Sequence, residues 1–494
     1  MSEPFKTGAC PDPKILAMEQ TRPSPTSVHP AARPAGPSGR WWGLPLLRAM
    51  RRDYLGFEMC MHRDYGDLCV LRLGYEQAWN LMSPELVREA LVGQHAHLIR
   101  WERGIEVFAQ VLGQSVLVTE GPTWQRQRRM LMPAFTPARV AGYAALMGRA
   151  GQGLLDRWIP AGVDQATVAM DDLWSEATMD VILQVLFSRP AEGDARRAAA
   201  ANRQLGATGF REMFLPLTLP DWLPLPGKHA KRTALHTLRT LIQRHVDARQ
   251  AAPASDAGPQ DLLGMLLSLR DDSSGEALSA QEVFDQCMVT FQAGHDTTTS
   301  GLLWWSWLMA THPEAAQRAA DEVDRVIGDA PPAADDLARL PWLQATLKEA
   351  LRLYPPAPAL MSRRTTTPIT LGGWTIPRGA MLRITPWTLH RDEQLFPQAE
   401  RFLPERFLDG APPPPKGAWM PFGAGPRVCI GQHFAQLEMA LLAAMLLQRF
   451  RLQVPAGAET PVPLLQVTLK PARPIHLTLH RRVRAAHTPA GALP

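Results

Sequence analysis

The sequence predicts a mainly α-helical protein with small β-sheets, an α+β fold, built around one long central helix. Apolar residues recur at helical spacing through much of the chain, which indicates many amphipathic helices. Ser279 and Glu282 form a capping box, and no proline follows until Pro313, so a helix of roughly 32 residues is expected between them. Short alternating segments near glycines and prolines predict the small sheets.

Length and composition restrict the class of protein. The chain has 494 residues, of which 46% are hydrophobic, enough for a large core. The net charge is +5, from 52 basic and 47 acidic residues, and no dense basic tract occurs, so no nucleic-acid partner is expected. The cysteines lack metal-ligand spacing and favour reduced thiols in a cytoplasmic protein over a disulfide framework: Cys10, Cys60, Cys69, Cys287 and Cys429.

No signal peptide or membrane-spanning segment is expected; a transit peptide stays open, although the prolines of the N-terminal region disfavour the amphipathic helix that it would need. The sequence has no apolar run of about 18 residues and no charged region followed by an apolar signal-peptide core. Residues 1–40 are rich in Pro, Ser, Ala and Gly and are expected to form a disordered arm, and residues 483–494 a frayed tail. The chain is therefore expected to be soluble, with its folded domain at 41–482.

In chain order, the first half predicts helices with two early strands. A helix is expected at 45–65, strands at 68–73 and 78–82, and a second helix at 84–92. Residues 93–120 are expected to be irregular. Another helix begins near Gly121, and more follow at 140–158, 170–187, 195–210 and 229–250.

Two segments of this half are candidates for binding. Trp124 and Arg128 are four residues apart, so on a helix they share a face and can clamp an anion; a packed tryptophan beside a solvated arginine is equally open. Residues 213–227 are apolar, but four prolines exclude a regular helix or a central strand. Such a loop marks ligand entry, membrane contact or a partner, unless it is tucked onto the core.

The middle of the long helix carries residues that weaken it. The run A-G-H-D-T-T-T at 293–299 contains Gly294 and three threonines, which are poor helix formers. A buried helix that gives up stability at its midpoint indicates a functional site. Asp296 beside Thr297 places a proton carrier next to a hydroxyl group. The alternative is a packing kink in which the aspartate is satisfied by a neighbour.

The C-terminal part predicts a helix, short strands and a glycine-rich loop. Glu349 and Arg352 are three residues apart on a helix at 342–354, among apolar residues that suggest an interior pair. Prolines force extended chain after it, and short strands are expected at 369–376, at 381–386 and within 450–480. A helix is expected at 433–450.

The loop at 422–431 reads F-G-A-G-P-R-V-C-I-G. Its glycines permit tight turns, and Cys429 is expected at or just before the first turn of the following helix. There, unpaired N–H groups and the positive end of the helix dipole favour a thiolate, which can bind a metal. A lone cysteine is more often a small buried hydrophobe, but the glycines, Phe422 and Arg427 make that reading less attractive.

Together these segments resemble the cytochrome P450 family, over about residues 41–482. The cysteine loop matches F-G-x-G-x-R-x-C-x-G at every fixed position, and Glu349 with Arg352 matches E-x-x-R. A-G-H-D-T-T resembles the oxygen-activation motif of the family's central helix, and Trp124 with Arg128 resembles W-x-x-x-R. The resemblance implies a single large P450-type domain of the soluble, bacterial-like kind.

The resemblance also implies roles for these residues. Cys429 would be the thiolate ligand of haem b, shielded by Phe422, with O2 as co-substrate. Asp296 would relay protons, and Thr297 would hold the oxygen under activation. The haem propionates would be held by four residues: Trp124, Arg128, Arg363 and Arg427. The family's buried charge triad, which supports the cysteine loop, would consist of Glu349, Arg352 and Arg406.

The implied reaction inserts one atom of O2 into a C–H or double bond of a lipophilic substrate. No flavin or iron–sulfur segment is visible, so a separate electron donor is expected: a ferredoxin, a flavodoxin or a flavin reductase. The protein is expected to be a monomer. A peroxide-dependent or hydroperoxide-rearranging haem enzyme and a haem-binding sensor remain alternatives. The pocket is expected to be lined by 213–219 and by small or apolar residues: Val116, Leu117, Ala293, Ala357 and Ala359.

Overall fold

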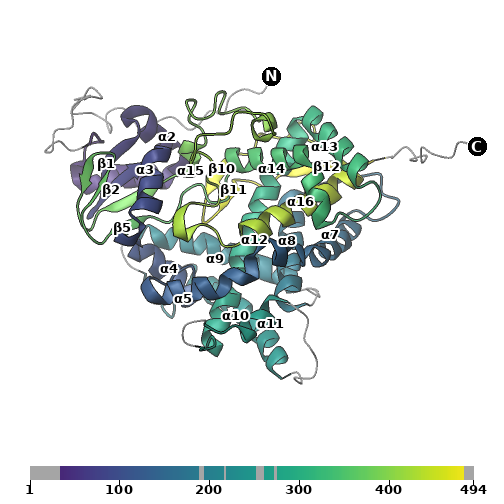
Figure 1. Ribbon diagram of the computed structural model, residues 1–494, viewed down its shortest axis with the longest axis horizontal. Coiled ribbons are helices and arrows are strands. Elements are labelled where there is room, and N and C mark those ends of the chain that lie inside the picture. The colour runs from purple at the N-terminus through teal and green to yellow at the C-terminus, as the bar shows by residue number, and fades with distance from the viewer. Residues whose placement is uncertain (1–33, 189–193, 216–217, 252–260, 272–274, 483–494) are drawn as a thin grey trace, which may run out of the picture.

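The computed structural model describes residues 34–188, 194–215, 218–251, 261–271 and 275–482 (Figure 1). Helices dominate, as predicted: α1 Leu44–Arg52, α2 Tyr54–Tyr65, α3 Pro84–Arg88, α4 Glu102–Leu112, α5 Gly121–Leu131, α6 Pro137–Ala141, α7 Ala144–Trp158, α8 Met170–Phe187, α9 Asp194–Met213, α10 Lys228–Gln250, α11 Leu262–Ser268, α12 Ala280–Thr311, α13 Pro313–Val326, α14 Pro341–Leu353, α15 Pro386–Leu389 and α16 Gln432–Arg449. Of the arm expected over residues 1–40, residues 1–33 lie outside the described residues, as does the tail over 483–494. Residues 34–40 are described, and the Ala35 carbonyl accepts a hydrogen bond from the Val70 amide at 3.2 Å, so this end of the arm packs on β1.

The strands form small sheets. They are β1 Leu68–Leu73, β2 Glu76–Leu81, β3 Leu98–Arg100, β4 Gln165–Ala169, β5 Arg363–Thr365, β6 Ile369–Leu371, β7 Trp374–Ile376, β8 Met381–Ile384, β9 Phe450–Gln453, β10 Pro463–Leu465, β11 Leu469–Pro471 and β12 His476–Arg481. The largest sheet has the order β1-β2-β8-β5-β3, with β2 and β8 parallel and its other pairs antiparallel. Strands β4, β12 and β9 form a second sheet, and β6–β7 and β10–β11 are two-stranded. The α+β fold class is confirmed.

The central helix α12 has the 32 residues and the N-terminal cap that the sequence predicts. The Ser279 hydroxyl accepts a hydrogen bond from the Glu282 amide at 3.2 Å, and the Glu282 carboxylate accepts one from the Ser279 amide at 2.9 Å. In its second half Trp304 and Trp305 are fully buried, and Trp304 stacks on Tyr354 with ring centroids 4.2 Å apart. Figure 1 shows α12 in the middle of the helical part, where it packs against α8, α14 and α16.

Two expectations about the elements were wrong, and two elements were missed. The helix expected at 45–65 is two helices, because Asp53 leaves the helical conformation and caps α2 by accepting the Gly56 amide at 2.9 Å. Residues 93–120 are not irregular, since they contain β3 and α4. The helical pattern of α4 was present in the sequence and was overlooked, since Ile105, Phe108 and Leu112 recur at helical spacing and pack in one apolar cluster. Strand β4 and helix α11 were also not predicted.

All but one of the cysteines whose state the structure shows are free thiols, as expected. Cys69, Cys287 and Cys429 carry free thiols. Burial raises the pKa of Cys69 and Cys287, the latter to about 12, so both stay protonated and inert. Cys60, in contrast, is disulfide-bonded, and the expectation is wrong for this residue.

The apolar segment 213–227 is partly tucked in and partly exposed. Phe214 packs against the core shared by α1, α2 and β1, whereas Trp222 is 72% exposed. Leu215 and Leu219 are also exposed. Part of the segment is therefore tucked onto the core, residues 216–217 lie outside the described residues, and a role in ligand entry, membrane contact or partner binding stays a prediction. Within the described residues, no helix is long and apolar enough to cross a membrane.

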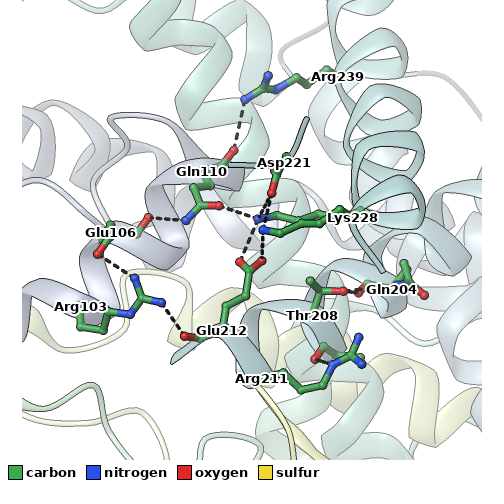
Figure 2. A network of polar contacts seen from close by, with 12 residues as sticks. Arg103, Glu106, Gln110, Gln204, Thr208, Arg211, Glu212, Asp221, Lys228 and Arg239 are labelled. Atoms are coloured by element: carbon green, nitrogen blue, oxygen red, sulfur yellow. Dashed lines mark hydrogen bonds and ion pairs between the residues drawn. The ribbon is translucent and has the colours of Figure 1, made fainter. Parts of the chain in front are cut away.

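A buried ion network fastens this segment to its neighbours (Figure 2). The Lys231 ammonium group is 2% exposed and lies 2.8 Å from the Glu212 carboxylate and 3.1 Å from that of Asp221. Lys228 contacts the same two carboxylates at 2.8 and 2.7 Å. Lys231 also donates to the side chain of Gln110. The network thus joins α4, the end of α9, the connecting loop and the start of α10.

We expect Lys231→Met to lower the free energy of unfolding by about 3–5 kcal/mol at neutral pH, because it leaves buried carboxylates with one ammonium group fewer. Burial raises the pKa of Asp221, but hydrogen bonds from Lys228 and Lys231 outweigh it and lower the pKa below 3.8. That stabilisation is present above the unfolded pKa and is lost as the pH falls through the folded pKa. The difference between the two proteins should therefore shrink in acid.

Urea denaturation between pH 7 and pH 3 would measure this effect. Arg239→Met is the matched control, because Arg239 lies on the same helix and donates to the Gln110 carbonyl from an exposed position. That change should cost less than about 0.5 kcal/mol. Equal losses in the two variants would contradict a special role of the buried network.

Candidate active site

The cysteine loop is closed by backbone hydrogen bonds. The Cys429 amide donates to the Phe422 carbonyl at 2.9 Å, and the Val428 amide to the Gly425 carbonyl at 3.0 Å. Gly425 has a φ of 72°, and a Cβ atom there would lie 2.1 Å from the Leu91 carbonyl oxygen. Glycine is therefore required at this position both for its conformation and for the close approach of the π-helical turn at Glu89–Gly93.

The surroundings of Cys429 do not favour a thiolate, contrary to the expectation. Burial raises the pKa of Cys429, and neither the hydrogen bond from the Gly431 amide nor the charge of Arg128 compensates for it. Cys429 does lie just before the following helix, as expected, since α16 begins at Gln432, but burial by the rest of the fold outweighs the effect of the helix end. The side chain is nevertheless accessible to solvent while deep in the protein, as expected for a residue that lines internal space.

The central helix also has an accessible face at its midpoint. Ala293 is exposed and Thr297 half-buried, although the neighbouring His295, Thr298 and Thr299 are buried. The Thr297 hydroxyl donates to the Ala293 carbonyl at 2.8 Å, and the next two threonines make the same bond one turn back. The accessible residues share one helical face, four positions apart. A strip of α12 therefore borders internal space, although the helix is otherwise buried.

Asp296 is satisfied by neighbouring side chains, as the packing alternative for this residue expected. Its carboxylate accepts a hydrogen bond from the Thr468 hydroxyl and forms an ion pair with Lys470 at 2.6 Å. Burial raises the pKa of Asp296, but the charge of Lys470 and the hydrogen bonds from Lys470 and Thr468 more than offset it, so the pKa lies below 3.8 and the group is ionised. The structure therefore ties Asp296 to the β10–β11 hairpin rather than to Thr297.

Away from Asp296, helix α12 is held to α8 and α9 by hydrogen bonds between uncharged side chains. His295 is fully buried and lies 3.1 Å from the Ser175 hydroxyl and 3.1 Å from the Asn202 amide. Burial lowers its pKa to about 4, which keeps the imidazole neutral. Gly294 lets α8 approach closely, since a Cβ atom there would lie 3.0 Å from the Ile182 side chain. Gly294 thus serves the packing of α12 against α8. This supports the alternative interpretation of the 293–299 segment as a packing feature, as far as the glycine is concerned.

Several arginines lie close together at and beside the cysteine loop. Arg427 stacks over the Trp124 ring at 3.8 Å, donates to the Thr119 carbonyl at 3.0 Å and pairs with Glu120. Arg363 is buried, and Arg128 is half-buried close enough to act on Cys429. The structure therefore brings together the four residues that were expected to bind an anion.

A fifth residue, Arg100 at the end of β3, belongs to this group and was missed. It is buried, and its Nη1 atom has no hydrogen-bond partner. Burial, with repulsion from Arg427, lowers its pKa to about 9, despite Glu120 nearby. Arg100, Arg363 and Arg427 thus share Glu120 as the carboxylate that offsets their charge, and Arg128 adds a further positive charge nearby. Such an excess of buried positive charge calls for an anionic ligand.

The expected charge triad is assembled. Glu349 and Arg352 are fully buried and joined by two hydrogen bonds of 2.7 and 2.8 Å. Arg406 lies 3.5 Å from the Glu349 carboxylate. Arg352 also donates to three backbone carbonyls between α15 and the cysteine loop, those of His390, Ala399 and Arg401.

The expected lining residues lie at intermediate burial. Val116 and Leu117 pack with a small apolar cluster between α4 and α12, and Ala357 and Ala359 are half-buried after α14. Glu438 on α16 was not expected. Its carboxyl group is buried and has no hydrogen-bond partner within 3.5 Å, and burial raises its pKa well above 4.5. The signal was available, since a lone glutamate in an apolar helix is unusual.

Comparison with known proteins agrees with this geometry. The cytochrome P450 family model matches residues 34–479. The chain is 34% identical to cyclooctatin synthase of Streptomyces melanosporofaciens, over 89% of this chain and 96% of that protein. It is 33% identical to cyclooctat-9-en-7-ol 5-monooxygenase of the same organism, over 87% and 94% of the two chains. Taurochenodeoxycholic 6 alpha-hydroxylase of Sus scrofa is 32% identical over 75% and 76%. The chain belongs to the cytochrome P450 family.

Proposed function

We propose that this protein hydroxylates a lipophilic, ring-containing substrate, with Cys429 as the haem ligand and with Thr297 and Asp296 serving proton delivery. The observation that carries the proposal is the accessible strip of α12 at Ala293 and Thr297, in a protein that also presents an accessible, deeply placed Cys429. A helix interior that is open at these positions provides room for a substrate beside a hydroxyl group.

The reaction class follows from the family. Its members bind haem b through a cysteine thiolate and use O2 as co-substrate, and this protein is a haem-thiolate monooxygenase. When bound, haem supplies the oxygen chemistry, which a thiolate ligand directs toward O–O cleavage. The electrons come from a separate redox partner, which we propose to be a ferredoxin, a flavodoxin or a flavin reductase. We also propose that the protein is a monomer.

The residues present fit haem at both ends. The arginine group formed by Arg100, Arg128, Arg363 and Arg427 suits the two carboxylates of the porphyrin, and the unpartnered Nη1 of Arg100 offers a donor. On the cysteine side, a Cβ atom at Gly431 would find only the Cys429 sulfur, 4.0 Å away, so the backbone leaves space for a flat group. When bound, the iron would supply positive charge that favours the thiolate form of Cys429.

Thr297 and Asp296 would then have separate tasks. The Thr297 hydroxyl gives its proton to the Ala293 carbonyl, so its oxygen lone pairs are left to accept a hydrogen bond from a water or another donor in the pocket. Asp296 is held by Lys470 and Thr468, so a proton reaches it only when this ion pair loosens. We propose that the pair keeps Asp296 charged between turnovers and controls when it passes a proton on.

The substrate class rests on the relatives and on the lining. Cyclooctat-9-en-7-ol, in the name of one relative, is an unsaturated cyclic alcohol, and the name of another refers to a bile-acid conjugate. The lining residues Val116, Leu117 and Ala293 are small or apolar. We therefore propose a carbon-rich cyclic substrate that carries few polar groups.

We expect Arg128→Leu to weaken haem binding by about 10- to 100-fold, because one charge-assisted hydrogen bond contributes about 1.5–3 kcal/mol. The rate of haem transfer from the holoprotein to apomyoglobin would measure the loss. Arg129→Leu is the matched control on the same helix, since Arg129 is half exposed and pairs with Asp271 at 3.2 Å. If both variants released haem at the same rate, Arg128 would not belong to the arginine group that binds the haem carboxylates.

We expect Thr297→Ala to lower the product formed per electron pair by about tenfold while reductant is still consumed, because a positioned hydroxyl in proton transfer typically contributes at least this much. Parallel measurement of O2 uptake, reductant oxidation and product with a surrogate reductase would test it. Thr311→Ala is the control, since Thr311 makes the same bond one turn back near the end of α12. Unchanged coupling would contradict the role, and equal turnover with hydrogen peroxide alone would favour a peroxide-dependent enzyme.

We expect cyclic unsaturated alcohols to produce a high-spin shift of the haem absorption band at lower concentration than linear fatty acids do. Displacement of water from the pocket by an apolar ring system is the physical cause. Difference spectra with a panel of both classes, titrated against the purified holoprotein, would measure the dissociation constants. Tighter binding of linear acids across the panel would exclude the proposed substrate class.

A further inference from the structure

A buried histidine lies between the charge triad and the cysteine loop. His390 follows α15 directly and is 0% exposed. Its ring packs edge-on against Phe396, with centroids 6.4 Å apart. None of the motifs in the sequence includes this residue, and it makes no contact that belongs to the proposed chemistry. It is therefore a fully buried polar side chain whose task the mechanism leaves unexplained.

Both ring nitrogens of His390 are hydrogen-bonded to backbone groups. The Nδ1 atom lies 3.0 Å from the Arg352 carbonyl oxygen, and the Nε2 atom accepts the Met420 amide proton at 2.9 Å. A carbonyl can only accept and an amide N–H can only donate, so the ring must be neutral with its proton on Nδ1. Burial, together with the charges of Arg352 and Arg391, lowers the pKa of His390 to about 3, which is consistent with that state.

On one side, His390 is part of the charge triad's surroundings. The Arg352 guanidinium donates to the His390 carbonyl at 2.6 Å, while the His390 ring donates to the Arg352 carbonyl. The two residues thus hold each other through main chain and side chain at once. Since Glu349 binds the same guanidinium, the ring has a fixed position relative to α14.

On the other side, the chain of hydrogen bonds continues to the cysteine. The Met420 carbonyl accepts the Gly423 amide at 3.0 Å, and the Phe422 carbonyl accepts the Cys429 amide at 2.9 Å. Met420 itself is buried and belongs to the core beneath the β1–β2 sheet. The bond from the Met420 amide to His390 is therefore a direct side-chain link between the start of the cysteine loop and the triad.

We propose that His390 is a positioning residue that sets the place of the Cys429 sulfur by holding the Met420 amide. This inference rests on the proposed role of Cys429 as haem ligand. The triad by itself fixes the segment after α15 through backbone carbonyls. His390 connects that segment to the cysteine loop. Because its ring is neutral with the proton on Nδ1, the Nε2 atom is free to accept the hydrogen bond from the Met420 amide.

Two substitutions separate the two bonds of the ring. In His390→Gln the side-chain oxygen reaches about as far as Nε2 and can still accept the Met420 amide. In His390→Asn the shorter amide reaches about as far as Nδ1 and can only donate to the Arg352 carbonyl. Both changes keep a buried polar group of similar character, so a general loss of packing should affect them alike.

For the holoprotein of each variant we expect three results. The His390→Asn protein should lose part of the red-shifted ferrous–CO band of thiolate ligation and show a changed reduction potential. Its Met420 amide should exchange with deuterium about tenfold faster, as one lost buried hydrogen bond implies. The His390→Gln protein should keep the native band, potential and exchange rate.

Other outcomes would overturn the inference. If both variants match the native protein, His390 does not position the loop; if both lose the band equally, the ring acts through packing alone. Circular dichroism checks that each variant is folded. Failure of the proposed function is distinguishable, because the native holoprotein itself would then lack the red-shifted band.

Discussion

The ion pair between Glu349 and Arg352 is the interaction on which the proximal side of the site depends. Both side chains are fully buried, and such a pair contributes little net stability because desolvation offsets its attraction. Its effect is on specificity. The Arg352 guanidinium donates hydrogen bonds to three backbone carbonyls from separate turns. The Glu349 carboxylate accepts a hydrogen bond from the Leu403 amide at 2.9 Å. An irregular stretch of chain is thereby held in one arrangement without helix or strand.

Charged side chains and neutral titratable side chains are distributed unevenly around the site. The arginine group carries more positive charge than its carboxylate neutralises, whereas His295, His390 and Glu438 are buried groups whose lowered or raised pKa keeps them neutral. Asp296 is charged but paired with Lys470. Uncompensated charge is thus confined to the side where the cofactor's carboxylates would lie.

The sequence predicted those parts of the site that depend on local spacing. Helical periodicity and capping determine α12, and fixed spacing places Cys429 in its loop and Glu349 beside Arg352. Partners brought in from distant elements could not be predicted, since Lys470 is 174 residues from Asp296 and Arg100 precedes Arg427 by most of the chain. The burial of Cys429, which raises the pKa of its thiol, could not be predicted for a related reason, because it depends on the whole fold.

The crowding of arginines has a consequence for how the protein is maintained in a cell. Arg100 and Arg427 repel each other in a buried place, so the cofactor-free protein carries an electrostatic cost that an anionic ligand removes. A ligand that binds only the folded state stabilises it by mass action. Haem supply would then control the abundance of this enzyme as well as its activity, because chains that stay empty are the ones that unfold and reach the proteases.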